Sequence, residues 1–276
     1  MRETPRSDGC LSLAGSRKAR SRPLAARLRR FAPVAAGTGA IVLSLVLACS
    51  RGPLPGMHQV EFQAADGFRL QGTVWTPGGR GEHPAVLMFA NLTQDRAVYK
   101  KLGEQLADTG LVALSVDLRV QGGSAQATDN ADPFSPENLR NLGQDARAAL
   151  AYLKERKDVD PRRIALVAAD GVVELVQRTI WSDSSIVAAA LLSPILPDSL
   201  APVVATHPPR PLFLACSFGD PSAAQVTKAI GDASPNARSY TKFYFACGHG
   251  TDMLWSPEGD NLTRLLRDWL VDALRE

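Results

Sequence analysis

The chain has 276 residues, of which 45% are hydrophobic and 21% are charged, which suits one sizeable core better than two. The formal net charge of +3 arises in residues 1–48, which hold nine Lys/Arg and two Asp/Glu, so the remainder carries 3 − 7 = −4. This balance argues against nucleic-acid binding. We also expect neither a metal nor a cofactor.

The first 48 residues have the layout of a secretory signal: an Arg-rich segment precedes an apolar run from Val34 to Ala48. The run is shorter than the roughly 20 residues of a transmembrane helix. It ends in Val46-Leu47-Ala48-Cys49-Ser50, which resembles the bacterial lipobox. An uncleaved anchor helix, or an ordinary signal with a chance cysteine, stays open as an alternative.

The lipobox resemblance implies that Cys49 is lipidated and becomes the mature N-terminus. We therefore expect a lipoprotein signal peptide in 1–48, a tether in 49–58 and one domain in 59–276. The protein would be lipid-anchored in the bacterial cell envelope, and Ser50 is compatible with the outer membrane, facing the periplasm.

The domain is predicted to open with two antiparallel strands, Val60–Ala64 and Phe68–Trp75, around an Asp66-Gly67 turn. From Pro84 onward, strand-like and helix-like stretches alternate. Further strands are expected at Ala85–Ala90, Leu111–Val116, Arg163–Ala168, Ile186–Leu192, Pro211–Cys216 and Thr241–Phe245. Helices are expected at Val98–Ala107, Leu139–Lys154, Val172–Trp181, Ser222–Ile230 and Asn261–Leu274.

This alternation predicts an α/β domain with a mostly parallel sheet covered by helices on both faces. Gln121 to Pro136 is a polar, Gly/Ser/Asp-rich stretch, which we expect to be a loop long enough to form a wall of a site.

Three short strings resemble motifs of the α/β-hydrolase superfamily, in the chain order that this fold uses. They are Asp117-Leu118-Arg119-Val120-Gln121-Gly122-Gly123-Ser124, Gly219-Asp220-Pro221 and Gly248-His249-Gly250. The closer resemblance is to dienelactone-hydrolase-like and small esterase-like members. It implies a sheet of eight strands without a cap domain, since only Ser193 to Arg210 separates the two strands between which a cap is inserted.

His249 and Asp220 supply the pair that a hydrolase needs: a general base and a carboxylate that holds it in one tautomer. His249 lies between two glycines after a predicted strand. The alternatives are a plain loop histidine and, for Asp220 before Pro221, a helix N-cap.

The nucleophile position departs from the family pattern. Where G-x-S-x-G is expected, the chain reads Ala168-Ala169-Asp170-Gly171-Val172, so Asp170 stands in place of serine and both outer glycines are lost. We expect a distorted elbow in which Gly171 takes up the positive φ. Ser124, Ser193 and Ser217 also follow predicted strands, but none lies in an elbow motif.

The oxyanion loop is altered as well. Ala90-Asn91, or Phe89-Ala90 in the alternative register, replaces the usual His-Gly or similar pair, and the amide of Gly171 would be the second donor. Asn91 also resembles the leaving-group residue of haloalkane dehalogenases, which use an aspartate nucleophile.

Two hypotheses remain open for function. The first is a domain with degraded catalysis that acts by binding a small molecule or as a structural part of the envelope. The second is an active hydrolase on ester or related small-molecule bonds, with Asp170 as nucleophile beside His249 and Asp220, resembling either carboxylic-ester hydrolases or dehalogenases and epoxide hydrolases.

Cys216 and Cys247 are the only cysteines after Cys49. In an oxidising envelope they would form a disulfide, and the alternative is two buried free thiols. The resemblance places their strands side by side, so a bond would join the Asp220 loop to the His249 loop.

Overall fold

The computed structural model describes residues 56–125, 135–195 and 209–275. The expected signal peptide and Cys49 lie outside the described residues. Within them, no helix is both long and apolar enough to cross a membrane.

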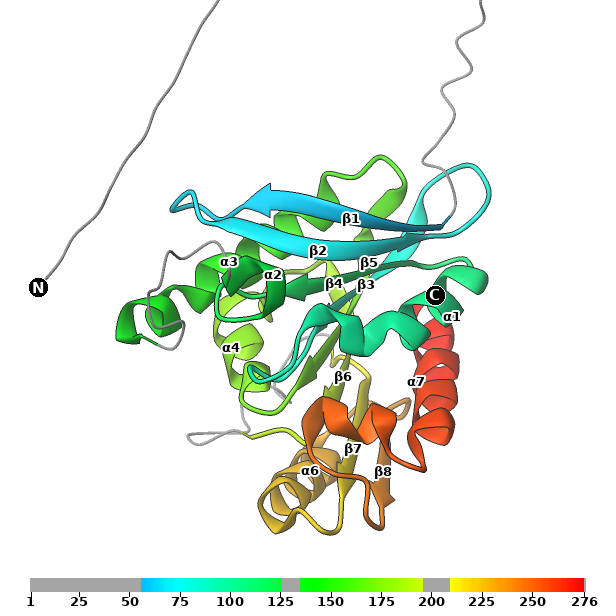
Figure 1. The fold of residues 1–276 in the computed structure, drawn as a ribbon. Coiled ribbons are helices and arrows are strands. Elements are labelled where there is room, and N and C mark those ends of the chain that lie inside the picture. The colour runs from blue at the N-terminus through cyan, green and yellow to red at the C-terminus, as the bar shows by residue number, and fades with distance from the viewer. Residues whose placement is uncertain (1–55, 126–134, 196–208, 276) are drawn as a thin grey trace, which may run out of the picture. The chain divides into compact units, whose positions relative to one another are not determined.

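The domain is built on one sheet in the order β1-β2-β4-β3-β5-β6-β7-β8 (Figure 1). Its strands are β1 Gly56–Gln63, β2 Arg69–Thr76, β3 His83–Phe89, β4 Val112–Asp117, β5 Val159–Ala169, β6 Ile186–Leu192, β7 Leu212–Ser217 and β8 Tyr240–Tyr244. Only the β1–β2 and β2–β4 pairs are antiparallel. The mostly parallel eight-stranded sheet is thereby confirmed, although β1 begins at Gly56, within the segment predicted as tether.

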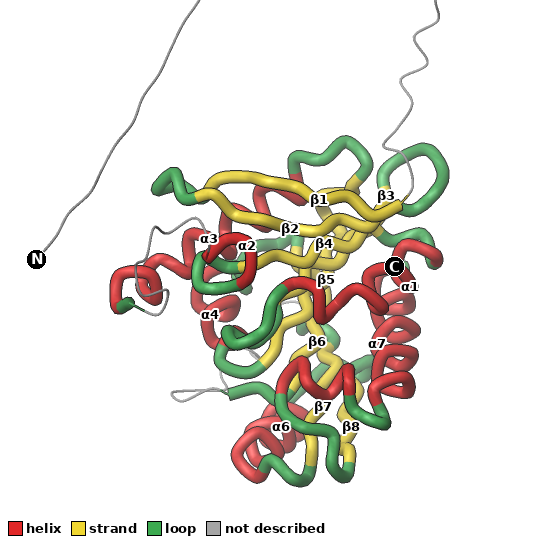
Figure 2. The backbone as a smooth tube through the Cα atoms, viewed as in Figure 1, coloured by secondary structure: helices red, strands yellow, loops and turns green. Residues whose placement is uncertain are grey.

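Helices cover both faces of this sheet, as expected (Figure 2). The α-helices are α1 Lys100–Asp108, α2 Gly122–Ala125, α3 Pro136–Lys154, α4 Val172–Thr179, α6 Pro221–Ala233 and α7 Gly259–Leu274, and two 3-10 helices are η1 Arg96–Tyr99 and η2 Gly250–Trp255. Helices α3, α4 and α6 contribute to one hydrophobic cluster, and α1 and α7 to the other. The sequence pattern missed η1, α2 and η2 because so few residues show no apolar periodicity.

The strands are buried on both faces because their side chains alternate between the two clusters. In β3, Ala85 and Leu87 pack into the cluster under α3 and α4, while Val86 and Met88 pack into the cluster under α1 and α7. This two-sided burial explains why the strands are almost continuously apolar in sequence.

The carboxyl ends of the parallel strands form the edge that carries the predicted site residues. Asp170 follows β5, Asp220 lies in the loop after β7 and His249 lies in the loop after β8. No cap domain is present in the parts of the chain that the structure describes.

Candidate active site

The turn from β5 to α4 is a tight strand–turn–helix junction despite the loss of the outer glycines. The Asp170 amide still donates to the Leu192 carbonyl at 3.0 Å, so sheet pairing with β6 extends to this residue, and the chain must turn there. Asp170 has φ +54°, whereas Gly171 has φ −64° and caps α4.

The expectation that Gly171 takes up the positive φ is therefore wrong. Aspartate tolerates this left-handed region better than most residues, because its short polar side chain hydrogen-bonds locally. Ala168 and Val172, which replace the glycines, are both buried in the core, so they fill space beneath the turn.

The structure brings the three predicted residues together into one hydrogen-bonded row. His249 Nε2 lies 3.0 Å from Asp170 Oδ1, and His249 Nδ1 is hydrogen-bonded to Asp220 Oδ2. The side chains of Asp170 and Asp220 are 29% and 19% exposed, and that of His249 is 36% exposed. Solvent therefore reaches the row mainly at Asp170 and His249.

Two carboxylates on one imidazole favour its protonated form. Burial by itself lowers the pKa of His249, but the hydrogen bonds to Asp220 and Asp170, together with their charges, outweigh it and raise the pKa above the usual value. An imidazolium that donates from both nitrogens has no lone pair with which to accept a proton. Because both ring nitrogens of His249 face carboxylate oxygens, neither is left free to take a proton from a substrate hydroxyl in this arrangement.

Asp220 also caps the following helix, since its side chain accepts from the Ala223 amide at 3.3 Å. The N-cap alternative and the pairing with His249 are thus both realised. One residue fixes the start of α6 and the orientation of the histidine.

The side chain of Asn91 is hydrogen-bonded to neighbouring residues. Its side-chain oxygen accepts from the Thr251 hydroxyl, and its Nδ2 donates to Thr93 Oγ1 at 2.9 Å. Gln121 Nε2 donates to the Asn91 carbonyl at 2.9 Å and so holds this loop. The stretch from Gln121 that is predicted to be a loop begins with α2, and most of the rest of it lies outside the described residues. Ala90, like Asn91, is buried.

The Gly171 amide, which is predicted to be an oxyanion donor, directly follows Asp170 and lies at the start of α4. No hydrogen bond of this amide to another described residue is found, and a Cβ at Gly171 would meet nothing within 4 Å. This amide therefore stays the candidate for the predicted oxyanion donor.

The Asp117–Ser124 string is structural in this protein. Asp117 is fully buried, pairs with Arg96 and accepts from the Gly123 amide at 2.9 Å. Arg119 forms a buried ion pair with Asp145 at 2.7 Å and a second pair with Asp66 at 2.8 Å. These contacts hold the β4 loop against α3 and the β1–β2 turn.

None of the three serines considered as alternative nucleophiles is bonded to His249 in the structure. Ser124 Oγ donates to the Asp117 carbonyl at 2.8 Å, and Ser193 Oγ contacts Met253 Sδ at 3.4 Å. Ser217 Oγ accepts from the amides of Gly219 and Cys247. All three are buried, which leaves Asp170 in the nucleophile position.

Cys216 and Cys247 are both buried and free, which is the second of the two expected alternatives. The reason is geometric: Cys216 is two residues from Leu214 in β7, so it faces the cluster that includes Leu214 and Ile230. Cys247 belongs to the cluster on the opposite face. The expected clamp between the two loops is instead made by Ser217.

An open cavity of about 540 Å³ lies beside the row, lined by Ser217, Gly219, Asp220, Pro221, Ala246, Gly248 and His249. Next to it, Phe218 stacks on Phe243 with ring centroids 5.0 Å apart, and Phe245 meets Phe218 edge-on at 6.2 Å. Phe218 and Phe245 are 58% and 88% exposed. No sequence pattern indicates this aromatic cluster, because its members come from two strand ends that only the sheet brings together.

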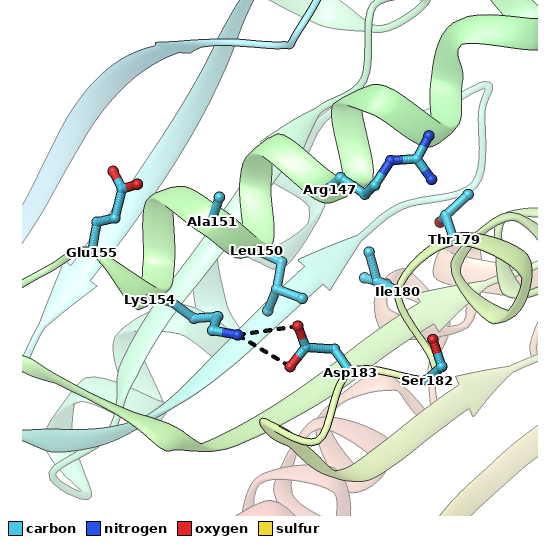
Figure 3. Close-up of a pocket in the computed structure, with 9 residues that line it drawn as sticks. All are labelled: Arg147, Leu150, Ala151, Lys154, Glu155, Thr179, Ile180, Ser182 and Asp183. Atoms are coloured by element: carbon cyan, nitrogen blue, oxygen red, sulfur yellow. Dashed lines mark hydrogen bonds and ion pairs between the residues drawn. The ribbon is translucent and has the colours of Figure 1, made fainter.

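A second cavity, of about 510 Å³, lies between α3 and the end of α4 (Figure 3). Lys154 and Asp183 face each other across it and form an ion pair at 3.1 Å. Its lining contains none of the predicted site residues, so we assign it no part in the chemistry.

The sheet order, the elbow and the position of His249 together define the α/β-hydrolase fold. Solved structures with this fold superimpose on most of the chain. A dienelactone hydrolase from Anabaena variabilis aligns with a TM-score of 0.64 and 14% identity, over 80% of this chain and 99% of the other. A thermophilic carboxylesterase from a metagenomic library aligns with a TM-score of 0.60 and 16% identity, over 82% and 92%.

Two curated relatives have higher sequence identity to this chain than the solved structures, but the alignments cover only part of each protein. An uncharacterized protein of Mycobacterium tuberculosis is 36% identical over 161 residues, covering 56% of this chain and 51% of the relative. The thiohydrolase ApmlB of Arthrinium phaeospermum is 29% identical over 191 residues, covering 68% and 54%. The chain thus spans about half the length of the curated relatives it matches. No protein-family model matches the chain.

Proposed function

We propose that this protein is a lipid-anchored envelope protein whose α/β-hydrolase domain binds a small molecule at the Asp170–His249 edge and has lost serine-type acyl transfer. The observation that carries the proposal is the 3.0 Å contact between Asp170 Oδ1 and His249 Nε2, with Asp220 on the other ring nitrogen. The ring nitrogen that would take a proton from a serine hydroxyl is bonded to a carboxylate instead.

Charge supports the same conclusion. Acyl transfer develops a negative oxygen on the substrate, and a serine enzyme stabilises it with preorganised donors. Here the Asp170 carboxylate adds a negative charge at that place, and attack on an ester carbonyl would form a mixed anhydride. Hydrolysis of ordinary esters is therefore expected to be very slow.

A second candidate is a hydrolase in which Asp170 is the nucleophile. It is favoured by the positive φ of Asp170 and by the retained row with His249 and Asp220. The carboxylate would attack an sp³ carbon, expel the leaving group and form an ester, which a water deprotonated by His249 would then hydrolyse to regenerate Asp170. Above the raised pKa of His249, the imidazole is free to do this.

The two candidates are separated by assaying the chain without its proposed anchor, beginning at Ser50, on nitrophenyl esters, a nitrophenyl thioester, haloalkanes and epoxides. The thioester is included because one relative is named a thiohydrolase. The variants are Asp170→Ser, Asp170→Asn and His249→Ala, and Lys228→Ala, which removes an exposed ion pair on α6, serves as a control outside the site.

We expect no turnover by the wild type and new esterase activity in Asp170→Ser. Wild-type turnover that disappears in both Asp170→Asn and His249→Ala would overturn the binding proposal in favour of the aspartate nucleophile. If Asp170→Ser stays inactive while folded, the loop around Asn91, and not Asp170 alone, prevents acyl transfer.

A further inference from the structure

The first described residue of the domain and the candidate site lie at opposite ends of the sheet. Gly56 pairs with Thr76 at the end of β2, which leads into the amino end of β3. Asp170 lies beyond the carboxyl end of β5. The length of a six- or seven-residue strand, about 20 Å, separates the two ends along the strand direction.

Gly56 and Asp170 are also separated across the sheet, perpendicular to the strands. β5 stands four places from β1 in the sheet order, which corresponds to about 19 Å at the usual strand spacing. Combining both directions places Asp170 roughly 30 Å from Gly56. Strand β8, which precedes His249, lies farther still from β1.

The distance from Gly56 back to Cys49 is limited by the number of residues between them. The segment 49–55 can span at most about 25 Å at full extension. A lipid on Cys49 would therefore keep Gly56, and with it the amino-end edge of the sheet, within that distance of the bilayer.

We infer that the anchor turns the Asp170–His249 site away from the membrane, so that its ligand is a water-soluble molecule and not a lipid resident in the bilayer. This inference rests on the proposed lipid attachment at Cys49. If the site faced the bilayer, Gly56 would lie at least about 20 Å from the membrane surface, which is close to the roughly 25 Å that the segment 49–55 can span at full extension.

Surface charge favours the same orientation. Asp170 and Asp220 outnumber His249, which lies between them, and the exposed Asp252 lies at the same edge, so anionic headgroups would repel this edge. Exposed side chains of both signs lie in or next to the loops of the opposite edge: Arg80, Lys157, Arg162, Arg238 and Arg275 against Glu82, Asp108, Glu155 and Asp272. This opposite edge carries no excess of negative charge.

The orientation is testable by energy transfer in the lipidated protein. The full chain is expressed in a bacterium that lipidates it, and the mature product is reconstituted in vesicles of phosphatidylethanolamine and phosphatidylglycerol that contain an acceptor dye on the headgroup. Donor dyes are placed on Lys157→Cys at the amino-end edge or on Phe245→Cys at the site edge. Neither residue belongs to the catalytic row, and the buried Cys216 and Cys247 should label little.

We expect clearly stronger transfer from position 157, corresponding to a difference of about 20 Å along the membrane normal. A long Gly/Ser insertion between Gly52 and Pro53 should reduce this difference. Equal or stronger transfer from position 245 in an anchored protein would overturn the orientation alone. Wild type that does not remain with the vesicles, or Cys49→Ala protein that does, would overturn the lipid attachment and the inference together.

Discussion

The buried ion pair between Arg119 and Asp145 allows a quantitative test of the role assigned to the β4 loop. The side chains are 3% and 0% exposed, and Asp145 accepts from the backbone amide, Nε and Nη2 of Arg119. In Asp145→Ala, the guanidinium would retain Asp66, which is 29% exposed, as its ion-pair partner and the ring of Phe68 against its face. Removing one partner of a buried ion pair costs about 3–5 kcal/mol of the free energy of unfolding, because the remaining buried charge is less well compensated.

That cost is large relative to the total stability of a typical domain, about 5–15 kcal/mol. For a domain of this size, 1 kcal/mol corresponds to roughly 2–4 °C in Tm, so we expect a decrease of roughly 6–20 °C. The measurement is urea and thermal unfolding of the mature chain, followed by circular dichroism.

The matched control is Lys228→Ala, which removes an exposed pair with Asp232 on α6. Its cost should stay below about 1 kcal/mol, because solvent screens both charges. The double variant Arg119→Met, Asp145→Leu should be more stable than Asp145→Ala, since no buried charge is left unpaired. If Asp145→Ala costs no more than the control, the buried pair does not hold the loop and the structural role is wrong.

Three further predictions concern the site and the core. Because the pKa of His249 is raised in the folded chain, its ionic contacts should stabilise the fold fully below about pH 6.5 and less as pH rises through the raised pKa. Asp170→Asn should weaken this pH dependence of the free energy of unfolding, measured in urea between pH 5 and 9. An unchanged pH dependence in the variant would contradict the prediction. Gly103→Ala should lower the free energy of unfolding by about 1–3 kcal/mol, since an added Cβ would lie 2.4 Å from the indole of the β2 tryptophan. Urea unfolding would measure this loss, with Gly171→Ala, where an added Cβ meets open space, as the control. Cys216 and Cys247 should both react with a thiol reagent in unfolded, unreduced protein, and a mass two units lower than the thiol form would indicate a disulfide instead.

Much of the fold was predictable because its signals are local. The strand predicted at Ile186–Leu192 coincides with β6, since an apolar run between turn residues has clear ends. The long helix predicted from Leu139 begins earlier, at Pro136, where Ser135 caps it by accepting from the Asn138 amide at 3.3 Å. The sequence pattern located the helix by its periodicity and missed only its first turn.

The site was predictable as a set of residues but not as an arrangement. Asp170, Asp220 and His249 were found from motif order, yet their contacts join residues 29 and 79 positions apart, which depend on three strands meeting at one edge. The positive φ was assigned to Gly171 on intrinsic preference. In the structure the positive φ lies one residue earlier, at Asp170, because the Asp170 amide still pairs with β6 and the chain turns there.

By itself, the sequence determined the alternation of strands and helices, the mostly parallel sheet and the aspartate in the elbow, because hydrophobic period and turn residues act over a few positions. Only the tertiary structure decided that His249 lies between two carboxylates, that the cysteines face opposite sides of the sheet and that three phenylalanines gather beside the cavity. These relations depend on how strands far apart in the chain are ordered in the sheet, and no local pattern encodes that order.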